Sequence, residues 1–492
     1  MASSHEIFRP RRSGVLLHPT SLPAAASDGG LGADSLRFLD FLAESGFSIW
    51  QMLPVHSTDQ SGSPYQGTSL HAGNPHLISW QRLVDQGWLR NVPAGNVHQP
   101  VIDATEIFRT AKHGFQQQAP AAEQAAYQAF IRDQSDWLDD YALYSVIKSL
   151  HGNSPWWQWP QPLRDREPAA LRSLREERNE SLEVRRFEQY VFFSQWRALL
   201  EAAHARDILL LGDMPILVAH DSVDVWAHPE YFKLDTAGQP VVVAGVPPDY
   251  FSATGQRWGN PLYDWRRFAD TGYRWWIERL RAQLQLFDMV RIDHFRGFVA
   301  LWEIDARSPT AEQGHWQPVP GRELFNVLRA EFGDLPLIAE DLGIISPEVD
   351  KLRDDFDLPG MKVLLFAFDS DERNPYLPHN HIRNSVVYTG THDNNTVLGW
   401  YYGLTDAQQQ RVLDYLQYPQ EPMPWPLINT ALQSVCRTAI LPMQDLLGLD
   451  GSHRMNIPGT SSGNWQWRFS WEWLSSDLPR KLRHLNKLYG RI

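Results

Sequence analysis

The chain has 492 residues, of which 43% are hydrophobic and 21% are charged, and its formal net charge is -13. This composition supplies a large buried core and excludes a mainly disordered chain. The acidic balance, without a dense Lys/Arg block, excludes a nucleic-acid groove. The N-terminal MASSHEIFRPRRSG has no apolar segment, and no run approaches the roughly 20 apolar residues of a membrane span. We therefore expect a cytoplasmic protein that binds neither nucleic acid nor membrane.

Two residue counts bear on the chemistry. Because the chain has one cysteine, Cys436, it contains neither an internal disulfide nor a cysteine metal cluster. Cys436 lies in a helical-looking run, ALQSVCRTAIL, and we expect a small core residue rather than a nucleophile. The 21 tryptophans favour a carbohydrate ligand, because flat rings with a polar edge suit the faces of sugars, although many of them will be core residues.

Eight short apolar runs recur along the chain, and most are continuous rather than alternating. Continuous runs are typical of strands that are buried on both faces of a parallel sheet. We predict strands at 13–20, 47–55, 207–215, 287–295, 335–343, 361–368, 384–393 and 438–447.

Helical patterns separate many of these runs. The segment 35–46 follows the first strand and ends at Gly46, a residue suited to a helix C-cap. The segments 272–287 and 321–333 precede the fourth and fifth strands. Strands that alternate with helices predict an α/β protein, and eight of them predict a (β/α)₈ TIM barrel.

The length of the chain exceeds that of a plain barrel, which needs about 250 residues. The surplus indicates two large insertions into a single catalytic unit spanning 1–492. One, at about 56–206, is mainly helical, and the other, at about 216–272, is rich in Gly, Pro and aromatic residues.

Four of the predicted strands deliver acidic residues at or near their ends: Asp213, Asp293, Glu340 and Asp393. In (β/α)₈ barrels the active site lies at the C-terminal ends of the strands. A single acid there is as often structural as functional, because carboxylates also cap helices and bind water. Four on one rim indicate a catalytic site.

Cleavage of a glycosidic bond needs two carboxyl groups in different settings, one ionised as nucleophile and one protonated as acid. Arg291 lies two residues before Asp293 on a strand, so the two side chains share a face. The guanidinium favours the ionised aspartate, which suits the nucleophile. Glu340 follows the apolar LPLIA without a basic sequence neighbour, so burial should raise its pKa toward about 6, typical of a general acid.

Residues beside these acids receive other expected roles. Asp341 should point away from the side that Glu340 faces, and we interpret it as structural. His392 and Asp393 form a polar pair suited to holding sugar hydroxyls and stabilising a distorted ring. His294 follows an inward-facing residue, so we expect its side chain to pack outward.

Motifs spread over residues 13–468 carry a resemblance to a known family. They are GVLLHPTSLP, WQMLPV, SPYQ, AGNPHLI, GDMPI, GVPPDYFSATGQRWGNPLYDW, RIDHFRGF, IAEDLG, LPGMKVL, TGTHDN and RMNIPGTSSGNWQWR. Together they resemble the amylomaltases, which are bacterial 4-α-glucanotransferases, or disproportionating enzymes, of the α-amylase clan.

The resemblance implies a (β/α)₈ barrel and a retaining double displacement on α-1,4-glucans. It implies Asp293 as nucleophile, Glu340 as acid/base and Asp393 as the third carboxylate. It also implies a loop near 247–258 that folds over the acceptor side. The substrate-binding positions that it implies are Arg291, His392, Asp213, Tyr250, Phe251, Gly255, Gln256, Trp258, Pro64, Tyr65, Gln66 and Asn464. The implied partners are maltooligosaccharides, starch or glycogen, with glucose as an acceptor, and the implied state is a monomer.

The sequence departs from the family pattern in three places. A segment that is usually PYGIGDLG reads AAASDGGLG at 24–32, and the segment before SPYQ, which usually carries Gly-Pro-Thr, reads HSTDQSG at 56–62. THDNDT becomes THDNNT, with Asn395 in place of an acid. None of these touches the proposed catalytic trio, but they bear on donor-side contacts and hence on the preferred glucan length.

Three other functions compete with glucan transfer. An α-1,4-glucan hydrolase would use the same residues, because water and a sugar hydroxyl can both attack a glucosyl-enzyme. The segment VPPDYFSATGQ has aromatic residues to stack on sugar and glycine for movement, which suits a lid that excludes water. A silent glycan-binding protein would not need all three carboxylates.

A metalloenzyme would need ligand spacing such as His-x-x-x-His near the strand ends, and the sequence has none there. The sequence also has no P-loop or dinucleotide fingerprint. We therefore expect no metal and no organic cofactor.

Overall fold

Eight parallel strands form one sheet in the computed structural model, which describes residues 4–59, 61–93, 104–248, 252–343, 345–460 and 462–492. The strand order is β10-β11-β12-β1-β2-β3-β6-β9. The edge strands β9 and β10 also meet, because the Ala339 N–H donates to the Pro359 carbonyl at 2.9 Å. The predicted (β/α)₈ barrel is therefore confirmed. Its strands are β1 (Arg12–Leu16), β2 (Ile49–Gln51), β3 (Leu209–Met214), β6 (Met289–Ile292), β9 (Leu337–Ala339), β10 (Gly360–Val363), β11 (Ser385–Tyr388) and β12 (Thr438–Pro442).

Each predicted apolar run overlaps one of these strands. Six strands lie inside their runs, whereas β1 and β10 begin one residue before theirs, and all eight strands are shorter than the runs. The ends of the runs leave the sheet where the chain turns toward the next helix. After β6, for example, Asp293 and His294 are outside the strand, and His294 has the left-handed φ of 53°. The run 438–447 divides into β12 and the short helix α19 (Met443–Leu446).

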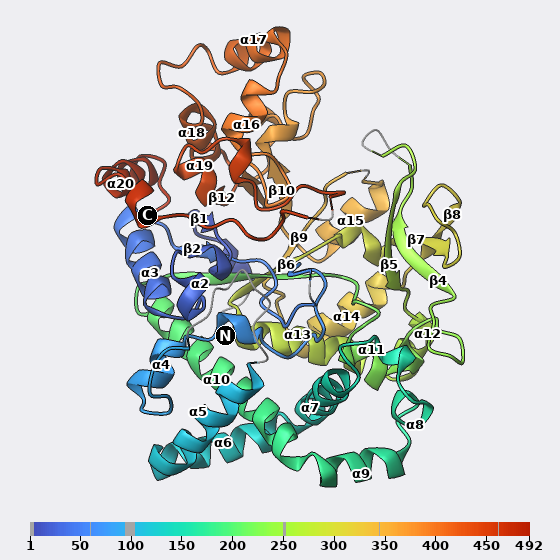
Figure 1. The fold of residues 1–492 in the computed structure, drawn as a ribbon. Helices are drawn as coiled ribbons and strands as arrows, with labels where there is room; N and C mark the ends of the chain where they lie inside the picture. The colour runs from blue at the N-terminus through green and yellow to red at the C-terminus, as the bar shows by residue number, and fades with distance from the viewer. Residues whose placement is uncertain (1–3, 60, 94–103, 249–251, 344, 461) are drawn as a thin grey trace.

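The three helices predicted beside the strands are confirmed as α3 (Ala33–Ser45), α13 (Arg274–Leu286) and α14 (Gly321–Phe332). Gly46 ends α3 in the left-handed conformation, with φ of 74°, and its N–H donates to the carbonyls of Ala43 and Leu42. Glycine adopts this conformation without the steric cost of a Cβ. Helices such as these cover the outside of the barrel (Figure 1).

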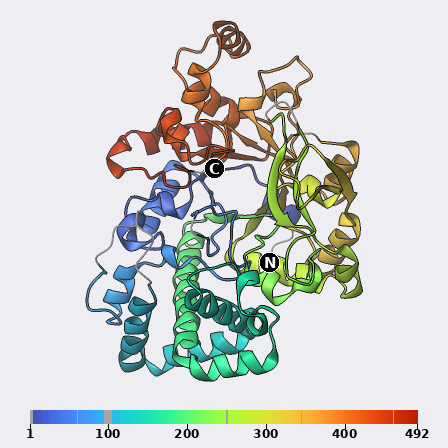
Figure 2. The ribbon, with the colours of Figure 1, turned by 45° about the vertical axis from the view of Figure 1, so that its right-hand side comes forward.

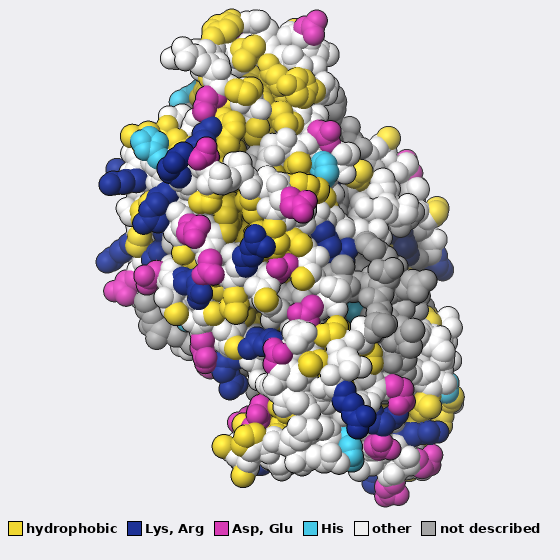
Figure 3. Space-filling view, turned by 60° about the vertical axis from the view of Figure 1, so that its left-hand side comes forward, with side chains coloured by type: hydrophobic (Ala, Val, Ile, Leu, Met, Phe, Trp, Pro, Cys, Tyr) yellow, Lys and Arg dark blue, Asp and Glu magenta, His cyan; other side chains and the backbone are white. Residues whose placement is uncertain are grey.

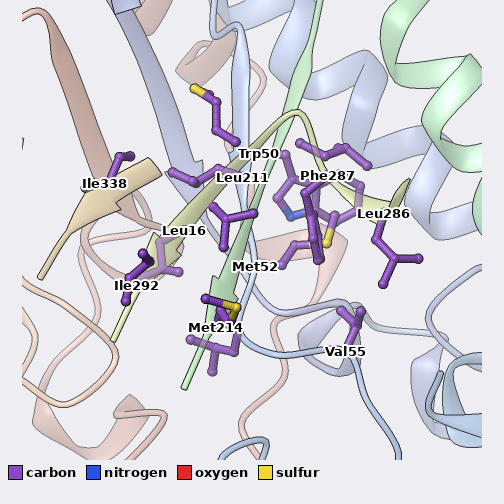
Figure 4. Close-up of a cluster of buried hydrophobic side chains, with 14 of the residues drawn as sticks. Leu16, Trp50, Met52, Val55, Leu211, Met214, Leu286, Phe287, Ile292 and Ile338 are labelled. Atoms are coloured by element: carbon purple, nitrogen blue, oxygen red, sulfur yellow. The ribbon is translucent and has the colours of Figure 1, made fainter. Parts of the chain in front are cut away.

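The core lies between the strands and the helices. Figure 4 shows buried side chains from β1, β2, β3, β6 and β9 that gather beside Leu286 and Phe287 at the end of α13. Strand residues buried on both faces account for the continuous apolar runs. The same packing fixes the strand ends, and with them the side chains that follow each strand.

The long segment 56–206 folds into helices that gather at one end of the molecule, opposite α16 to α18 (Figures 1 and 2). These helices are α4 (Trp80–Asp85), α5 (Thr105–Gln118), α6 (Ala121–Asp133), α7 (Ser135–Leu150), α8 (Gln161–Arg164), α9 (Pro168–Glu177) and α10 (Asn179–His204). The remaining helices are α1 (Ser4–Phe8), α2 (Ala25–Asp28), α15 (Pro347–Asp355), α16 (Val397–Tyr402), α17 (Asp406–Tyr415), α18 (Trp425–Gln433) and α20 (Leu478–Leu488).

A second sheet, which was not predicted from the sequence, stands beside the barrel (Figure 2). Four antiparallel strands form it in the order β5-β4-β7-β8. Half-buried and exposed residues predominate in β8, so it lacks the apolar run that marks the barrel strands. The segment 216–272 contributes α11 (Val223–Ala227), β4 (Val242–Val246), β5 (Gln256–Pro261) and α12 (Trp265–Asp270), and a later excursion contributes β7 (Ala300–Asp305) and β8 (Gly314–Pro318).

Cys436 is buried, as expected, but the helical run predicted around it is wrong. Helix α18 ends at Gln433, and Cys436 lies in the connection to β12. Its N–H donates to the Ser434 hydroxyl, a local bond that replaces the helical one.

The described surface carries charges of both signs. On the face in Figure 3, acidic and basic side chains are interspersed rather than gathered by sign. Within the described ranges, no helix is long and apolar enough to cross a membrane.

Candidate active site

A cavity of about 750 Å³ opens at the C-terminal ends of the barrel strands. Strands β3, β6, β9 and β11 lead into it, and β5 of the second sheet borders it. The segments around 63–66 and 456–465 also contribute to its lining. The residues predicted for the site that line this cavity are Tyr65, Gln66, Gln256, Trp258, Arg291, Asp293, Glu340 and Asp393.

Charged groups from three neighbouring strands form the floor of the cavity, by which we mean Asp213, Arg291, Asp293 and Glu340. The register of β3 and β6 places Asp213 opposite Arg291. The buried guanidinium of Arg291 bridges two carboxylates, with Nη1 2.7 Å from Oδ2 of Asp213 and Nη2 3.0 Å from Oδ1 of Asp293. The predicted contact between Arg291 and Asp293 is therefore confirmed.

This bridge keeps the arginine charged. Burial alone would lower the pKa of Arg291, but the carboxylates of Asp213 and Asp293 raise that pKa well above its usual value. The Tyr65 hydroxyl donates to the same Asp213 carboxylate at 2.7 Å. Asp213 thus lies beneath the cavity as the fixed counter-charge of Arg291, which leaves Asp293 facing the cavity.

Glu340 directly follows β9, and its carboxylate lies against the backbone of His294, the residue after Asp293. Its Oε2 accepts a hydrogen bond from the His294 N–H at 2.6 Å, and its Oε1 accepts one from the Leu342 N–H at 3.0 Å. Desolvation raises the pKa of Glu340 to about 7 with help from the charge of Asp293, while Arg291 and the two amides oppose the shift. The expected rise is confirmed, and it matches an acid/base that works near neutral pH.

The expectation that His294 packs outward is wrong, because its side chain lines the cavity. Its left-handed backbone breaks the alternation of the strand, so consecutive side chains turn toward the same side. The imidazole meets the Trp258 indole edge to face, with ring centroids 4.9 Å apart.

Asp341, by contrast, points away from the cavity as expected. It pairs with Arg353, and its Oδ1 accepts a hydrogen bond from the Met361 N–H at 2.7 Å. These bonds join β9 to α15 and β10, so Asp341 has a structural role in the barrel.

Asp393 and His392 come from the loop after β11. The Asn456 amide donates to Oδ1 of Asp393 at 2.6 Å, and Nε2 of His392 lies 3.4 Å from its Oδ2. The His392 ring stacks on Tyr65 at 5.2 Å with an interplanar angle of 14°, and Trp465 lies about 6 Å from both rings. This aromatic cluster connects the floor with the segment 456–465.

Four of the predicted residues contribute in other ways or fall outside the described residues. Pro64 is buried and does not line the cavity. Asn464 supports its own loop, since its amide oxygen accepts from the Ile457 N–H and its nitrogen donates to Thr460. Tyr250 and Phe251 lie outside the described residues.

Gly255 is required by its backbone rather than by a contact with the cavity. Its φ is 67°, and a Cβ there would lie 2.4 Å from the Val246 carbonyl oxygen. Only glycine fits at this turn between β4 and β5.

One side of the cavity is formed by the wall, by which we mean residues 215–217 together with Gln256, Trp258 and Asn260. Residues 215–217 continue the chain past β3. The other three come from β5, and all three line the cavity.

Several residues that line the cavity were not predicted from the sequence, among them Asn260, Asp369, Tyr376, Asn456 and Trp465. A signal was present for most of them, because Asn456 and Trp465 stand in the quoted RMNIPGTSSGNWQWR motif and Asp369 follows the sixth predicted strand. Tyr376, further along the same connection, had no such signal.

The arrangement suits chemistry by two carboxyl groups. Asp293 is paired with a cation, whereas the pKa of Glu340 is about 7. That difference is what a nucleophile and an acid/base require. Among the described residues, no group of three or more His, Cys, Asp or Glu side chains is placed to hold a metal ion.

Comparisons with known proteins agree over most of the chain. A family model described as 4-alpha-glucanotransferase matches residues 17–474. The 4-alpha-glucanotransferase of Thermus thermophilus is 48% identical over 497 residues, which cover 98% of this chain and 99% of the relative. That of Synechocystis sp. is 46% identical, and the alignment covers 98% of each chain.

Solved structures are also similar. The amylomaltase from Streptococcus agalactiae, in complex with acarbose, aligns with a TM-score of 0.93 at 37% identity and covers 98% of this chain and 99% of its own. The amylomaltase from Corynebacterium glutamicum shares the fold, with a TM-score of 0.71 at 19% identity, covering 99% of this chain and 75% of its own.

Proposed function

We propose a mechanism for this chain, which belongs to the 4-alpha-glucanotransferase family: a retaining double displacement with Asp293 as nucleophile and Glu340 as acid/base. Members of this family are glycosyltransferases that act on α-glucans. The proposal concerns the covalent intermediate, the roles of the residues, and the donor and acceptor.

In the first step, a carboxylate oxygen of Asp293 attacks C1 of the donor glucose unit. Glu340, which is protonated at this stage, donates its proton to the glycosidic oxygen, so the leaving glucan departs with a free 4-hydroxyl. Arg291 favours this step because its Nη2, 3.0 Å from Oδ1 of Asp293, orients the attacking carboxylate. The product is a β-linked glucosyl ester on Asp293.

In the second step, Glu340 is a carboxylate and takes the proton of the acceptor 4-hydroxyl. The acceptor oxygen attacks C1 and the ester bond to Asp293 breaks, which restores the α configuration and both catalytic groups. We assign Asp393 to bind hydroxyls of the distorted ring; its contact with the Asn456 amide and its closeness to His392 support this role. No proton or electron is left over.

The proposed donors are maltooligosaccharides, starch or glycogen, and the acceptors include glucose. We assign the wall to the acceptor side. Trp258 supplies a flat face for a sugar ring, and Gln256 and Asn260 supply amides for its hydroxyls. We further propose that one copy of the chain suffices, which a sizing column with active enzyme would test.

The observation that carries the proposal is the asymmetry of the floor. Asp293 pairs with a buried arginine, whereas Glu340 lies beside it with a pKa of about 7. Two equivalent carboxylates would not divide the nucleophile and acid roles in this way.

Maltotriose alone, as both donor and acceptor, tests transfer against hydrolysis. We expect glucose together with a ladder of longer maltooligosaccharides on chromatography. A mixture of glucose and maltose without a ladder would identify a hydrolase that uses the same residues.

The covalent step has its own test in the Glu340→Gln variant treated with α-maltotriosyl fluoride. Fluoride leaves without an acid, and the loss of the base slows the second step, so the ester should accumulate. Mass spectrometry should find the added glucan on the peptide that contains Asp293. Glu340→Gln combined with Asp293→Asn is the control and should carry none. Absence of an adduct, with fluoride still released, would refute the assignment of Asp293.

A further inference from the structure

Residues 215–218 form an irregular segment between β3 and the second sheet. Pro215, Ile216 and Leu217 line the cavity, and residues 216–218 are buried. Within the described chain, no backbone–backbone hydrogen bond reaches residues 215–218. Because a buried carbonyl without a partner is costly, side chains must supply the donors.

Three side chains supply them: Arg279 and Tyr263, which do not line the cavity, and Asn260, which is part of the wall. Nη1 of Arg279 donates to the Ile216 carbonyl at 2.9 Å, and Nη2 donates to the Pro215 carbonyl. The Tyr263 hydroxyl donates to the Ile216 carbonyl at 2.8 Å, and the Asn260 amide donates to the Val218 carbonyl at 2.8 Å. Each carbonyl that these bonds hold belongs to the wall or follows it directly.

Arg279 is an unusual residue for its position on α13. Its side chain is fully buried, with 0% exposure, and the described carboxylates form no ion pair with it. Its guanidinium carbon lies 4.9 Å from the Trp276 ring and 5.4 Å from the Trp275 ring. Burying a cation without an ion pair costs stability, and burial lowers the pKa of Arg279, yet an arginine in a protein keeps its charge.

The planar guanidinium provides what a hydrophobic residue could not. It holds two consecutive carbonyls at once, and Nη1 also donates to the Tyr263 hydroxyl at 3.1 Å. Tyr263 follows β5, the strand that carries Trp258 and Asn260. Arg279 therefore fixes the two halves of the wall, the end of β3 and the end of β5, relative to each other.

We propose that Arg279 is a positioning residue that holds the wall in the shape that binds the acceptor sugar and thereby favours transfer over hydrolysis. The proposal rests on the proposed function, because it assigns the wall to the second step. Arg279 touches neither the floor nor the cavity, so it acts through residues 215–217 and Tyr263. The first step, carried out by the floor, should depend on it little.

The test compares the two half-reactions in Arg279→Met and Arg279→Lys. The kcat/KM for fluoride release from α-maltotriosyl fluoride reports the first step, because fluoride departs in that step. The ratio of hydrolysis to transfer, with glucose as acceptor, reports the second. For Arg279→Met we expect a roughly tenfold higher ratio and a similar rise in acceptor KM, because small misplacements of binding groups have effects of this size or larger. Fluoride release per folded enzyme should change by less than about twofold, and Arg279→Lys should recover part of the loss, because its ammonium still donates to carbonyls.

Two further variants separate positioning from general damage. Tyr263→Phe removes one hydroxyl that bonds both Ile216 and Arg279, and it should raise the same ratio by about threefold, the effect of one modest hydrogen bond. If Arg279→Met does not fold, the ratio of hydrolysis to transfer in Tyr263→Phe tests the proposal instead. Arg281→Met, on the same helix, removes an exposed arginine paired with Glu331 and should leave the ratio unchanged.

The outcomes are distinct. If Arg279→Met and Tyr263→Phe slow both half-reactions equally and leave the ratio unchanged, Arg279 supports only the fold and the proposal is wrong. If wild-type enzyme makes no ladder from maltotriose, the proposed function itself fails, whatever the variants do.

Discussion

The floor and the wall of the cavity are built on different physical principles. The floor is charged: Arg291 joins Asp213 and Asp293 through ion pairs at the ends of adjacent barrel strands. The wall, by contrast, is held through its neutral backbone carbonyls, which accept hydrogen bonds from the side chains of Tyr263 and Arg279. One region is part of the regular barrel, and the other is irregular and depends on the second sheet.

In the proposed mechanism, this difference lets one cavity serve two half-reactions. The floor would supply the two catalytic carboxyl groups and be needed in both steps. The wall would contribute no catalytic group and would act where an acceptor is bound and water is excluded. Changes in the floor should therefore affect total turnover, whereas changes in the wall should alter the partition of products.

The largest effect is expected for Asp293→Asn. An amide cannot form the glucosyl ester, and losses of about 10⁴-fold or more in kcat accompany removal of a nucleophile. The measurement is maltotriose disproportionation, with thermal unfolding to verify the fold. Asp305→Asn, which removes an exposed carboxylate on β7, is the control, and retained turnover in Asp293→Asn would reassign the nucleophile.

Arg291→Met should have the next largest effect, because it breaks the bridge in the floor. The buried Asp213, only 1% exposed, would lose its ion-pair partner, which costs about 3–5 kcal/mol of unfolding free energy. Activity should fall roughly 100-fold or more as Asp293 loses its orientation. Urea unfolding checks the stability, and the double variant Asp213→Asn/Arg291→Met should be less destabilised than Arg291→Met alone. Arg307→Met, on the surface, should behave as wild type.

The pH dependence tests Glu340 without a mutation. The acid must be protonated in the first step, and its pKa is raised to about 7, so activity should be retained below pH 7 and lost as pH rises through it. With maltotriose, kcat/KM should fall about tenfold per unit, or roughly 100-fold at pH 9. With α-maltotriosyl fluoride, whose leaving group needs no proton, fluoride release should not show this fall. The same alkaline decline with both donors would contradict the role of Glu340.

The smallest effect is expected from the wall. Trp258→Ala removes an aromatic face worth about 0.5–1.5 kcal/mol, which corresponds to a roughly three- to tenfold rise in acceptor KM. Fluoride release in the first step should stay near the wild-type rate. Trp473→Ala, at an exposed indole that does not line the cavity, is the matched control. If Trp258→Ala slowed both half-reactions equally, Trp258 would be needed in the first step as well and would not act on the acceptor alone.

Much of the barrel was predictable from local patterns. Each of the eight strands overlaps a predicted apolar run, and most of these runs are continuous because burial on both faces leaves no room for polar alternation. Asp293 and Glu340 were predictable as a pair, since residues that follow parallel strands meet on one rim. The contact of Arg291 with Asp293 followed from their spacing of two residues.

Other features had no local signal. The second sheet was missed because strands such as β8 are short and partly exposed. His294 was placed outward because alternation holds only while the backbone stays extended, and its left-handed φ appears only in the folded chain.

The amino-acid sequence by itself determined the barrel strands and the order in which acidic residues reach its rim, because burial pattern and strand-end position are local properties of the chain. Only the tertiary structure decided how those residues differ. Arg291 on β6 contacts Asp213 on the neighbouring strand β3, although the two residues are 78 positions apart in the sequence. Arg279 reaches the Ile216 carbonyl 63 positions away, from another element. Such contacts depend on the relative placement of whole elements, which packing fixes and sequence spacing does not reveal.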